Sequence, residues 1–229
     1  MQDIVPDNPP AFNVPGIIVG LGAILVSIHA IMSWASDALY RDILLTFSFI
    51  PISYTISADQ LVTAGSRFWS PLTYAFLHGD WVHLLVNSIW LLAFGSAVAR
   101  RFGALRFAAL FVFGAIAGAA FHYLFHPVGN VPVVGASAAV SACMGAAVRF
   151  AFRPGGVAPD VETAPAFSLL ESLKNRNIMT FVVMWFAINW LFGTGWLTPG
   201  EAGIAWEAHM GGFLLGWLGF SAFDRRSSS

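Results

Sequence analysis

Six apolar segments, each near the length that a helix needs to cross a lipid bilayer, constrain the fold of this chain more than any other feature of its sequence. A bilayer core requires about 20 predominantly apolar residues per helix. Charged residues make up 10% of the 229 residues, whereas ordinary soluble domains carry about 25%. We therefore expect an all-α, polytopic membrane protein with six transmembrane helices. The expected spans are Pro15–Trp34, Trp81–Val98, Leu105–Phe125, Val133–Phe150, Ile178–Trp196 and Ile204–Phe220.

The sequence predicts one membrane domain at residues 15–222, between an N-terminal tail at 1–14 and a C-terminal tail at 223–229. A long first loop, about residues 35–80, has too few charges for a soluble domain and is interrupted by Pro51. We expect this loop to be partly helical and to lie at the membrane interface, where Trp69 suits an anchor.

Basic residues predict the orientation of the chain. Nine of its eleven Lys and Arg residues fall in or directly beside the loops after the second and fourth spans, or in the C-terminal tail. Because positive charge favours the cytoplasmic side, we expect both termini in the cytoplasm, a site that opens to the outer side, and the inner membrane of a bacterial cell as the location. The net charge of −1 indicates no nucleic-acid partner.

Polar side chains lie near the outer ends of the second, fourth and sixth spans, which all run in the same direction. At ~1.5 Å rise per residue, they all fall within roughly 10 Å of the outer ends of their helices. Such groups in a bilayer usually face the bundle interior. We interpret them together as a candidate reaction site, although each one alone could equally serve helix packing. They are His83 and Asn87, Ser137 and Ser141, and His209.

Ser137 is favoured over Ser141 as a nucleophile, because it follows Gly135 and Ala136 at the expected start of a helix. The first four N–H groups of a helix have no internal partner and attract anions. Ser141 lies one turn deeper, where its own N–H is already used.

Small residues repeat every four positions on the fourth and sixth spans, so we expect these two helices to pack closely.

Three short motifs, in their order and in their placement on these spans, resemble the rhomboid family of intramembrane serine proteases. “FLHGDWVHLLVNSIWLLAFG” resembles the second helix of the family, “GASA” its glycine-x-serine-glycine motif, and “AHMGG” its alanine-histidine-x-x-glycine motif. The resemblance extends from about Trp69 to Gly216 and implies a rhomboid-type bundle of six helices.

The resemblance implies a catalytic dyad of Ser137 and His209, without a cofactor or a metal. His209 would take the proton of Ser137, and the Ser137 N–H with the side chains of His83 and Asn87 would hold the oxyanion. The implied substrates are transmembrane proteins, cut in or near their spans, in contact with membrane lipid. The alternative is a catalytically inactive rhomboid-like protein that binds membrane proteins.

Several positions depart from the family pattern. Ala138 stands where glycine is usual, and Ser141 where the family often has an aromatic that stacks on the catalytic histidine. Ser141 could hydrogen-bond the histidine instead, and the Ala138 methyl group could crowd the helix contact or the oxyanion pocket. Trp69–Ser70 and Ala99–Arg100–Arg101 replace the usual Trp-Arg and Glu-x-Arg patterns.

The resemblance also assigns the fifth span as a movable lateral gate and residues 193–207 as a loop that caps the site. The alternative is that the aromatic residues of this span face lipid. They include Phe181, Trp185, Phe186 and Trp190.

Other classes of membrane protein fit this sequence less well. The HExxH motif of zinc proteases is absent, and the spans hold no aspartate for an aspartyl protease. A transporter or a histidine-ligated metal or haem protein is a further alternative, because His122 and His126 lie four residues apart near the outer end of the third span. We expect no carboxylate ligand in the spans, and we assign this pair to lipid headgroups.

Overall fold

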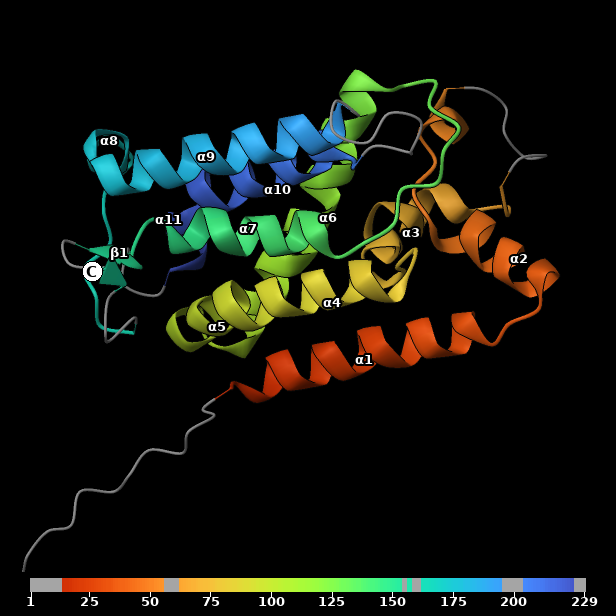
Figure 1. The fold of residues 1–229 in the computed structure, drawn as a ribbon, viewed down its shortest axis with the longest axis horizontal. Coiled ribbons are helices and arrows are strands. Elements are labelled where there is room, and N and C mark those ends of the chain that lie inside the picture. Colours follow the sequence, from red (N-terminus) through yellow and green to blue (C-terminus); the bar gives the residue numbers. More distant parts are fainter. Residues whose placement is uncertain (1–13, 56–61, 154–155, 158–161, 195–203, 225–229) are drawn as a thin grey trace, which may run out of the picture.

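The computed structural model describes residues 14–55, 62–153, 156–157, 162–194 and 204–224, which form a bundle of helices (Figure 1). Short 3₁₀ turns η1 (Pro51–Tyr54) and η2 (Tyr74–Phe76) lie in the first loop, and a π-helical segment η3 (Leu91–Gly95) joins α4 to α5. An antiparallel hairpin of β1 (Phe152–Arg153) and β2 (Gly156–Val157) adds a small β element. The helices are α1 (Gly16–Ser33), α2 (Asp37–Phe47), α3 (Ser66–Thr73), α4 (Trp81–Trp90), α5 (Ser96–Phe102), α6 (Ala104–Phe125), α7 (Ser137–Ala147), α8 (Leu169–Lys174), α9 (Arg176–Gly193), α10 (Trp206–Leu218) and α11 (Phe220–Phe223).

The expected all-α architecture is confirmed, and three stretches within the described residues are long and apolar enough to cross a membrane: Gly16–Ser33, Trp81–Phe102 and Ala104–Phe125. They match the first three expected spans. Helices α7, α9 and α10, with 11, 18 and 13 residues, occupy the positions of the other three. Because α7 and α10 are shorter than a bilayer crossing requires, the expected bounds of these two spans are too wide.

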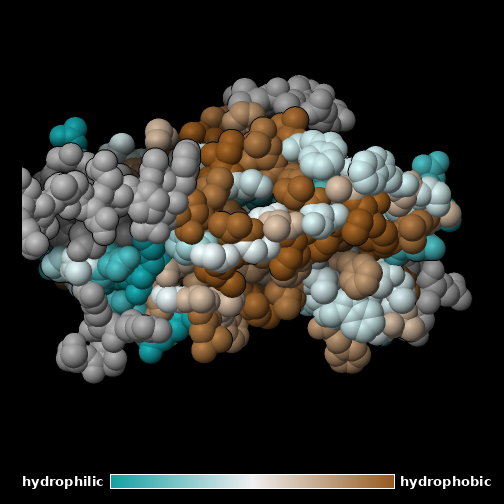
Figure 2. All heavy atoms as spheres, turned by 90° about the horizontal axis from the view of Figure 1, so that it is seen from below, coloured by the Kyte–Doolittle hydropathy of each residue, from teal (hydrophilic) through white to brown (hydrophobic). Residues whose placement is uncertain are grey.

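Apolar side chains face outward along the long helices, as lipid contact requires. Figure 2 shows a face whose middle is hydrophobic, with hydrophilic residues toward its two ends. Leu105 and Leu124, near the two ends of α6, are 83% and 72% exposed. An apolar surface of this extent on a protein marks contact with another apolar phase, here the hydrocarbon of a bilayer.

Helix α7 lies in the centre of the bundle, between α4 and α10 (Figure 1). Every residue from Ala138 to Ala147 is buried, so α7 contacts protein on all sides. Non-helical backbone at membrane depth is tolerated where protein or a water-filled cavity surrounds it. This burial explains why a helix of 11 residues suffices where the sequence predicts a full span.

Glycines bring the backbone of α10 against that of α7. A Cβ added at Gly212 would overlap the Ala138 carbonyl group, and one added at Gly216 would overlap the Ala142 carbonyl group. Gly145 of α7 faces the backbone of α10 in the same way. The close packing that the small-residue repeat predicts is therefore present in the structure.

The first loop is partly helical, as expected, and it holds the segment that leads into α7. Phe49 and Val133 exchange two backbone hydrogen bonds of 3.1 and 2.8 Å. The Gly135 N–H donates to the Tyr74 carbonyl oxygen at 3.0 Å. These bonds fix the backbone two residues before α7 begins.

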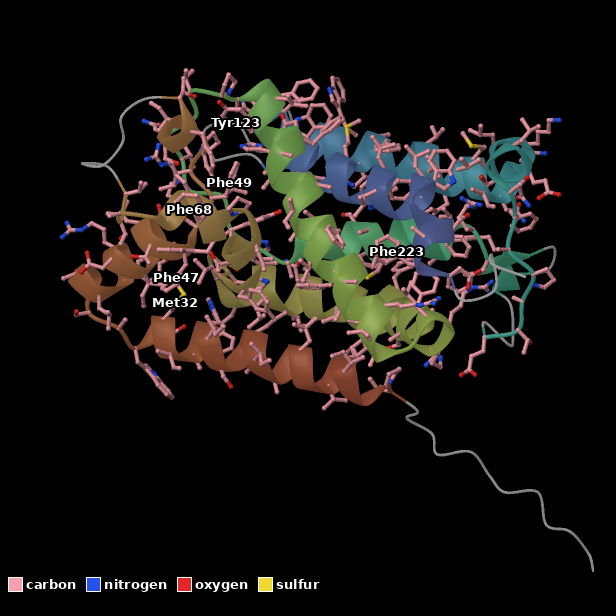
Figure 3. All side chains as sticks on the ribbon, turned by 180° about the vertical axis from the view of Figure 1, so that it is seen from behind. Met32, Phe47, Phe49, Phe68, Tyr123 and Phe223 are labelled. Atoms are coloured by element: carbon pink, nitrogen blue, oxygen red, sulfur yellow. The ribbon has the colours of Figure 1, made fainter. Side chains whose placement is uncertain are left out.

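Side chains of the first loop also contact α6. The hydroxyl groups of Tyr123 and Thr55 lie 3.4 Å apart, toward the opposite end of the bundle from Phe223 (Figure 3). The Trp69 indole N–H donates to the Thr46 carbonyl oxygen at 2.8 Å. Trp69 therefore joins α3 to α2, a contact within the loop that its sequence position alone did not predict.

An ion pair braces the end of the bundle away from the first loop. Arg101 Nη2 lies 2.9 Å from Asp224 Oδ2, and both side chains are buried. Arg101 Nη1 donates to the Ala164 carbonyl oxygen at 2.6 Å, and its guanidinium carbon lies 4.7 Å from the centre of the Phe150 ring. The family pattern has a glutamate at the position of Ala99. In this chain the carboxylate that pairs with Arg101 comes instead from Asp224, far away in the sequence.

Replacing Gly216 with alanine is expected to destabilise the protein, because the added methyl group would overlap the Ala142 carbonyl group and push α10 away from α7. Overpacking of this kind costs about 1–3 kcal/mol. Thermal unfolding of the purified chain in detergent measures the loss. Gly22→Ala on α1 is the matched control, because a Cβ there meets nothing within 4 Å. Equal effects of the two substitutions would contradict the packing described here.

Candidate active site

Ser137 and His209 form a hydrogen-bonded pair at one end of the contact between α7 and α10. Ser137 is the first residue of α7, and His209 lies in the first turn of α10. Ser137 Oγ and His209 Nε2 are 2.7 Å apart, a distance at which the hydroxyl can donate to a neutral imidazole. Both residues are half-buried. The two predicted dyad residues, 72 positions apart in the chain, are therefore in direct contact.

Asn189 of α9 holds the other nitrogen of the His209 ring. Its Oδ1 lies 2.5 Å from His209 Nδ1, and its Nδ2 donates to the Trp185 carbonyl oxygen at 2.8 Å. The bond to Trp185 turns the amide so that its oxygen faces the imidazole. An amide oxygen accepts and cannot donate, so Asn189 favours the tautomer with the proton on Nδ1 and a free lone pair on Nε2 toward Ser137.

Asn189 is not among the predicted site residues. It is a polar residue in a span whose sequence is dominated by aromatic residues. A polar side chain in an apolar helix is the signal that could have identified it. Its partner His209 lies 20 positions away on another helix, a proximity that spacing along the chain does not give.

His83 approaches Ser137 across Gly135. A Cβ added at Gly135 would lie 2.7 Å from His83 Nε2 and 3.6 Å from Ser137 Oγ, so these groups converge on one glycine. The φ of Gly135 is +122°, which side-chain-bearing residues rarely adopt.

Asp80 caps α4 by accepting the His83 backbone N–H at 2.8 Å, and this bond lowers the pKa of the Asp80 carboxyl below its ordinary value.

Asn87 lies one turn further along α4 and is buried. Its Nδ2 donates to the His83 carbonyl oxygen at 2.9 Å. Because the amide carries a second N–H, this bond leaves one donor unused. The structure thus brings His83 beside Ser137 and ties Asn87 to its own helix.

Backbone N–H groups at the start of α7 add further donors. The first backbone bond of this helix runs from the Val140 N–H to the Ala136 carbonyl oxygen, at 2.9 Å. The N–H groups of Ser137, Ala138 and Ala139 therefore precede the hydrogen-bond ladder of the helix. They carry the partial positive charge of a helix N-terminus, which favours an anion there.

The second serine of the motif makes no hydrogen bond to His209 among the described residues, because both ring nitrogens have other partners. Ser141 Oγ donates to the Ser137 carbonyl oxygen at 2.7 Å, a bond that serine commonly makes within helices. The suggestion that Ser141 takes the place of the missing aromatic by hydrogen-bonding the histidine is therefore wrong. In this chain Asn189 provides the side-chain contact that Ser141 does not.

The methyl group of Ala138 packs against α6. A Cβ added at Gly118 of α6 would overlap the Ala138 methyl group, and the Ala138 carbonyl group faces Gly212 of α10. Gly118 therefore provides the space that the larger residue at 138 requires.

The aromatic residues of α9 divide between the bundle and the outside. The rings of Trp185 and Phe186 lie 4.8 and 5.4 Å from that of Phe213 on α10, and the Phe181 ring lies 5.9 Å from Phe94. Trp190, in contrast, is 47% exposed. The lipid-facing alternative thus fits Trp190 but not the packed rings, and the movable gate stays a prediction. Most of the predicted capping loop, at 195–203, lies outside the described residues.

A carboxylate joins the histidine pair at the end of α6. His122 Nδ1 and His126 Nε2 lie 3.3 and 2.8 Å from the two carboxylate oxygens of Glu207. The expectation that the spans offer no carboxylate is wrong, because Glu207 lies inside the sixth expected span and is buried. These histidines therefore contact a carboxylate within the protein, and their contact with lipid headgroups stays a prediction.

The fold and the site define a polytopic helical membrane protein with a serine–histidine pair held between its helices. Residues 65–224 match the Rhomboid domain. The chain therefore belongs to the rhomboid family, and the resemblance predicted from its motifs is confirmed. The family includes serine proteases.

Relatives from plants and bacteria are similar to this chain. It is 30% identical to RHOMBOID-like protein 5 of Arabidopsis thaliana over 162 residues, which are 70% of this chain and 46% of that protein. It is 27% identical to RHOMBOID-like protein 12, mitochondrial, of the same plant over 180 residues, 72% of this chain and 48% of that protein. Rhomboid protease GluP of Bacillus subtilis (strain 168) is 30% identical over 93 residues, 41% of this chain and 18% of that protein. The chain thus spans about half the length of the two plant relatives.

Replacing Asn189 with alanine is expected to slow the reaction of Ser137 with a fluorophosphonate probe. The loss of a hydrogen bond worth about 1 kcal/mol would leave His209 free to change tautomer, so we expect a fall of about fivefold to tenfold in the labelling rate. The rate is measured by gel fluorescence over time. Asn177→Ala, which changes an exposed asparagine on the same helix, is the matched control. Equal rates for both variants would show that Asn189 does not position His209.

Proposed function

We propose that this chain is an intramembrane serine endopeptidase that hydrolyses peptide bonds in or near transmembrane segments of other membrane proteins. The observation that carries the proposal is the 2.7 Å approach of Ser137 Oγ to His209 Nε2. Membership of a family that includes serine proteases supports it. The intact serine and histidine favour this activity over the alternative of an inactive protein that binds membrane proteins.

The reaction begins when Ser137 Oγ attacks the carbonyl carbon of the scissile bond and its proton passes to His209 Nε2. The tetrahedral intermediate then collapses. The C–N bond breaks, and His209 returns the proton to the leaving amine, which leaves an acyl group on Ser137. A water molecule, deprotonated by His209, attacks this ester, and the carboxylic acid product leaves as Ser137 Oγ regains its proton.

Negative charge on the carbonyl oxygen is balanced by donors that converge beside Ser137. We assign this role to the Ser137 backbone N–H, to the His83 side chain and to the unused N–H of the Asn87 amide. The approach of His83 Nε2 to Gly135 supports the assignment. Each such donor typically contributes about 100-fold to 1,000-fold in rate.

Asn189 acts as a positioning residue in this mechanism. It touches neither the substrate nor the reacting atoms, and its amide oxygen keeps the proton of His209 on Nδ1. When His209 becomes an imidazolium, the same oxygen stabilises the positive charge as a neutral dipole. A carboxylate would add the attraction between two full charges, so the support from a neutral amide oxygen is weaker than that of a carboxylate.

The membrane setting completes the proposal. We propose that α7, α9 and α10 join the three long apolar helices in a core of six membrane-embedded helices, with both termini in the cytoplasm and the site toward the outer side. The inner membrane of a bacterial cell is the proposed location. Helix α9, whose outer residues such as Trp190 and Ile188 are exposed, is the side from which a substrate helix would enter.

Cleavage of a single-span membrane protein in liposomes tests this function. The wild-type chain should produce two fragments, while Ser137→Ala and His209→Ala should produce none above background, because removal of either dyad member typically costs more than about 10,000-fold. Ser141→Ala is the matched control, since its hydroxyl bonds only the Ser137 carbonyl group in the described structure, and it should retain cleavage.

Two outcomes would overturn the proposal. Cleavage by Ser137→Ala at the wild-type rate would show that another group is the nucleophile. No cleavage of any of several single-span substrates by the folded wild-type chain, together with their co-purification with it, would support the inactive binding protein.

A further inference from the structure

Three possible metal ligands meet where α6 ends and α10 begins. His122 lies in the last turn of α6, His126 caps it, and Glu207 lies in the first turn of α10. One ligand atom from each residue can be chosen so that all lie within 4.8 Å of one another. The rings of the two histidines are 4.8 Å apart, centre to centre. The cluster therefore gathers two imidazole nitrogens around the two oxygens of one carboxylate.

The distances within the cluster are near those of a metal site. Zn²⁺ binds imidazole nitrogen and carboxylate oxygen at about 2.0–2.2 Å, so two ligands of a tetrahedral ion lie about 3.4 Å apart. The two N–O separations here are 3.3 and 2.8 Å. These two separations run to different carboxylate oxygens, and the ligand atoms of the three residues are spread over up to 4.8 Å. An ion would therefore draw them together by roughly 1 Å, and the half-exposed His126 side chain is the one with room to move.

Burial and access also suit an exchangeable ion. The Glu207 side chain is 7% exposed and that of His122 is 12% exposed, whereas that of His126 is 48% exposed. The carboxylate and one imidazole are thus fixed inside the protein, and the third ligand lies beside an open path to solvent. Both oxygens of this buried carboxylate already contact imidazole nitrogens, and a divalent cation among these groups would give the carboxylate a full positive partner.

The cluster is separate from the dyad. Successive helical residues are rotated by about 100°, so Glu207 and His209 point to nearly opposite sides of α10. Glu207 faces α6 through its two histidines, and His209 faces Ser137 and Asn189. An ion held by Glu207 would therefore act on α10 as a whole and not on the reacting atoms.

We propose that His122, His126 and Glu207 bind a divalent transition-metal ion of the Zn²⁺ class, which ties the end of α6 to the start of α10. Two imidazoles and one carboxylate are a donor set that such ions prefer. Three protein ligands leave at least one position for water, as in exchangeable sites. The ion fastens the two helices near the aromatic contact of Phe125 with Trp206, whose rings are 6.3 Å apart.

Titration with Zn²⁺ alone tests the proposal. The full chain, purified with an affinity tag that contains no histidine and treated with a chelator, is titrated in detergent by calorimetry. We expect one Zn²⁺ per chain. Glu207→Gln and His126→Ala should each lower the affinity by about 100-fold or more, because even the loss of an outer-shell partner costs about 10- to 100-fold. Co²⁺ should give visible absorption bands that both variants lose.

Matched controls separate this site from other causes. Glu171→Gln changes an exposed glutamate of α8 and should bind Zn²⁺ as the wild type does. Because His126 is half-exposed, His126→Ala tests the site even if Glu207→Gln fails to fold. Zn²⁺ should also raise the unfolding temperature of the wild type and leave that of His126→Ala unchanged, since a ligand stabilises the folded state that binds it.

Two results would overturn the metal site: no Zn²⁺ binding by the folded wild type, or wild-type affinity in both His126→Ala and Glu207→Gln. The second result would assign the ion to other histidines, such as His78 and His83. Ser137→Ala should bind Zn²⁺ normally. Failure of the peptidase proposal therefore leaves this test intact, and failure of this test leaves the peptidase proposal intact.

Discussion

The close approach of the α7 and α10 backbones is the contact on which the candidate site depends. Gly212 and Gly216 let carbonyl groups of α7 reach the surface of α10, and a side chain at either position would separate the helices. A hydrogen bond between Ser137 and His209 tolerates only a few tenths of an ångström of change. Packing of small residues therefore determines whether two distant polar residues become a pair.

The histidine of this pair is held differently from what the family pattern predicts. An aromatic one turn after the serine would support the ring by stacking, but Ser141 bonds to the backbone of its own helix. Asn189 supports the ring through a directional bond to Nδ1 instead. Because Asn189 lies on α9, the helix with exposed aromatic residues, outward movement of α9 would release His209. The position of α9 and the geometry of the Ser137–His209 pair are thereby linked through one side chain.

Sequence periodicity and composition predicted the features that depend on local pattern. The helical class, the three long apolar helices and the start of α7 at Ser137 follow from hydropathy and from the glycine before the serine. The lengths of α7 and α10 did not follow, because hydropathy cannot distinguish a helix enclosed by protein from one that faces lipid. Asn189 was missed because its role depends on a partner on another helix. Glu207 is present in the sequence of the sixth expected span and was overlooked there, whereas its contacts with His122 and His126 depend on the fold.

The central claim is that contact with His209 makes Ser137, and not Ser141, the reactive serine. Mass spectrometry of the fluorophosphonate-treated chain in liposomes measures this directly, because the peptide that contains both serines can be fragmented to locate the adduct. We predict one adduct, on Ser137, that is lost in His209→Ala. An adduct on Ser141, or an undiminished yield in His209→Ala, would contradict the account.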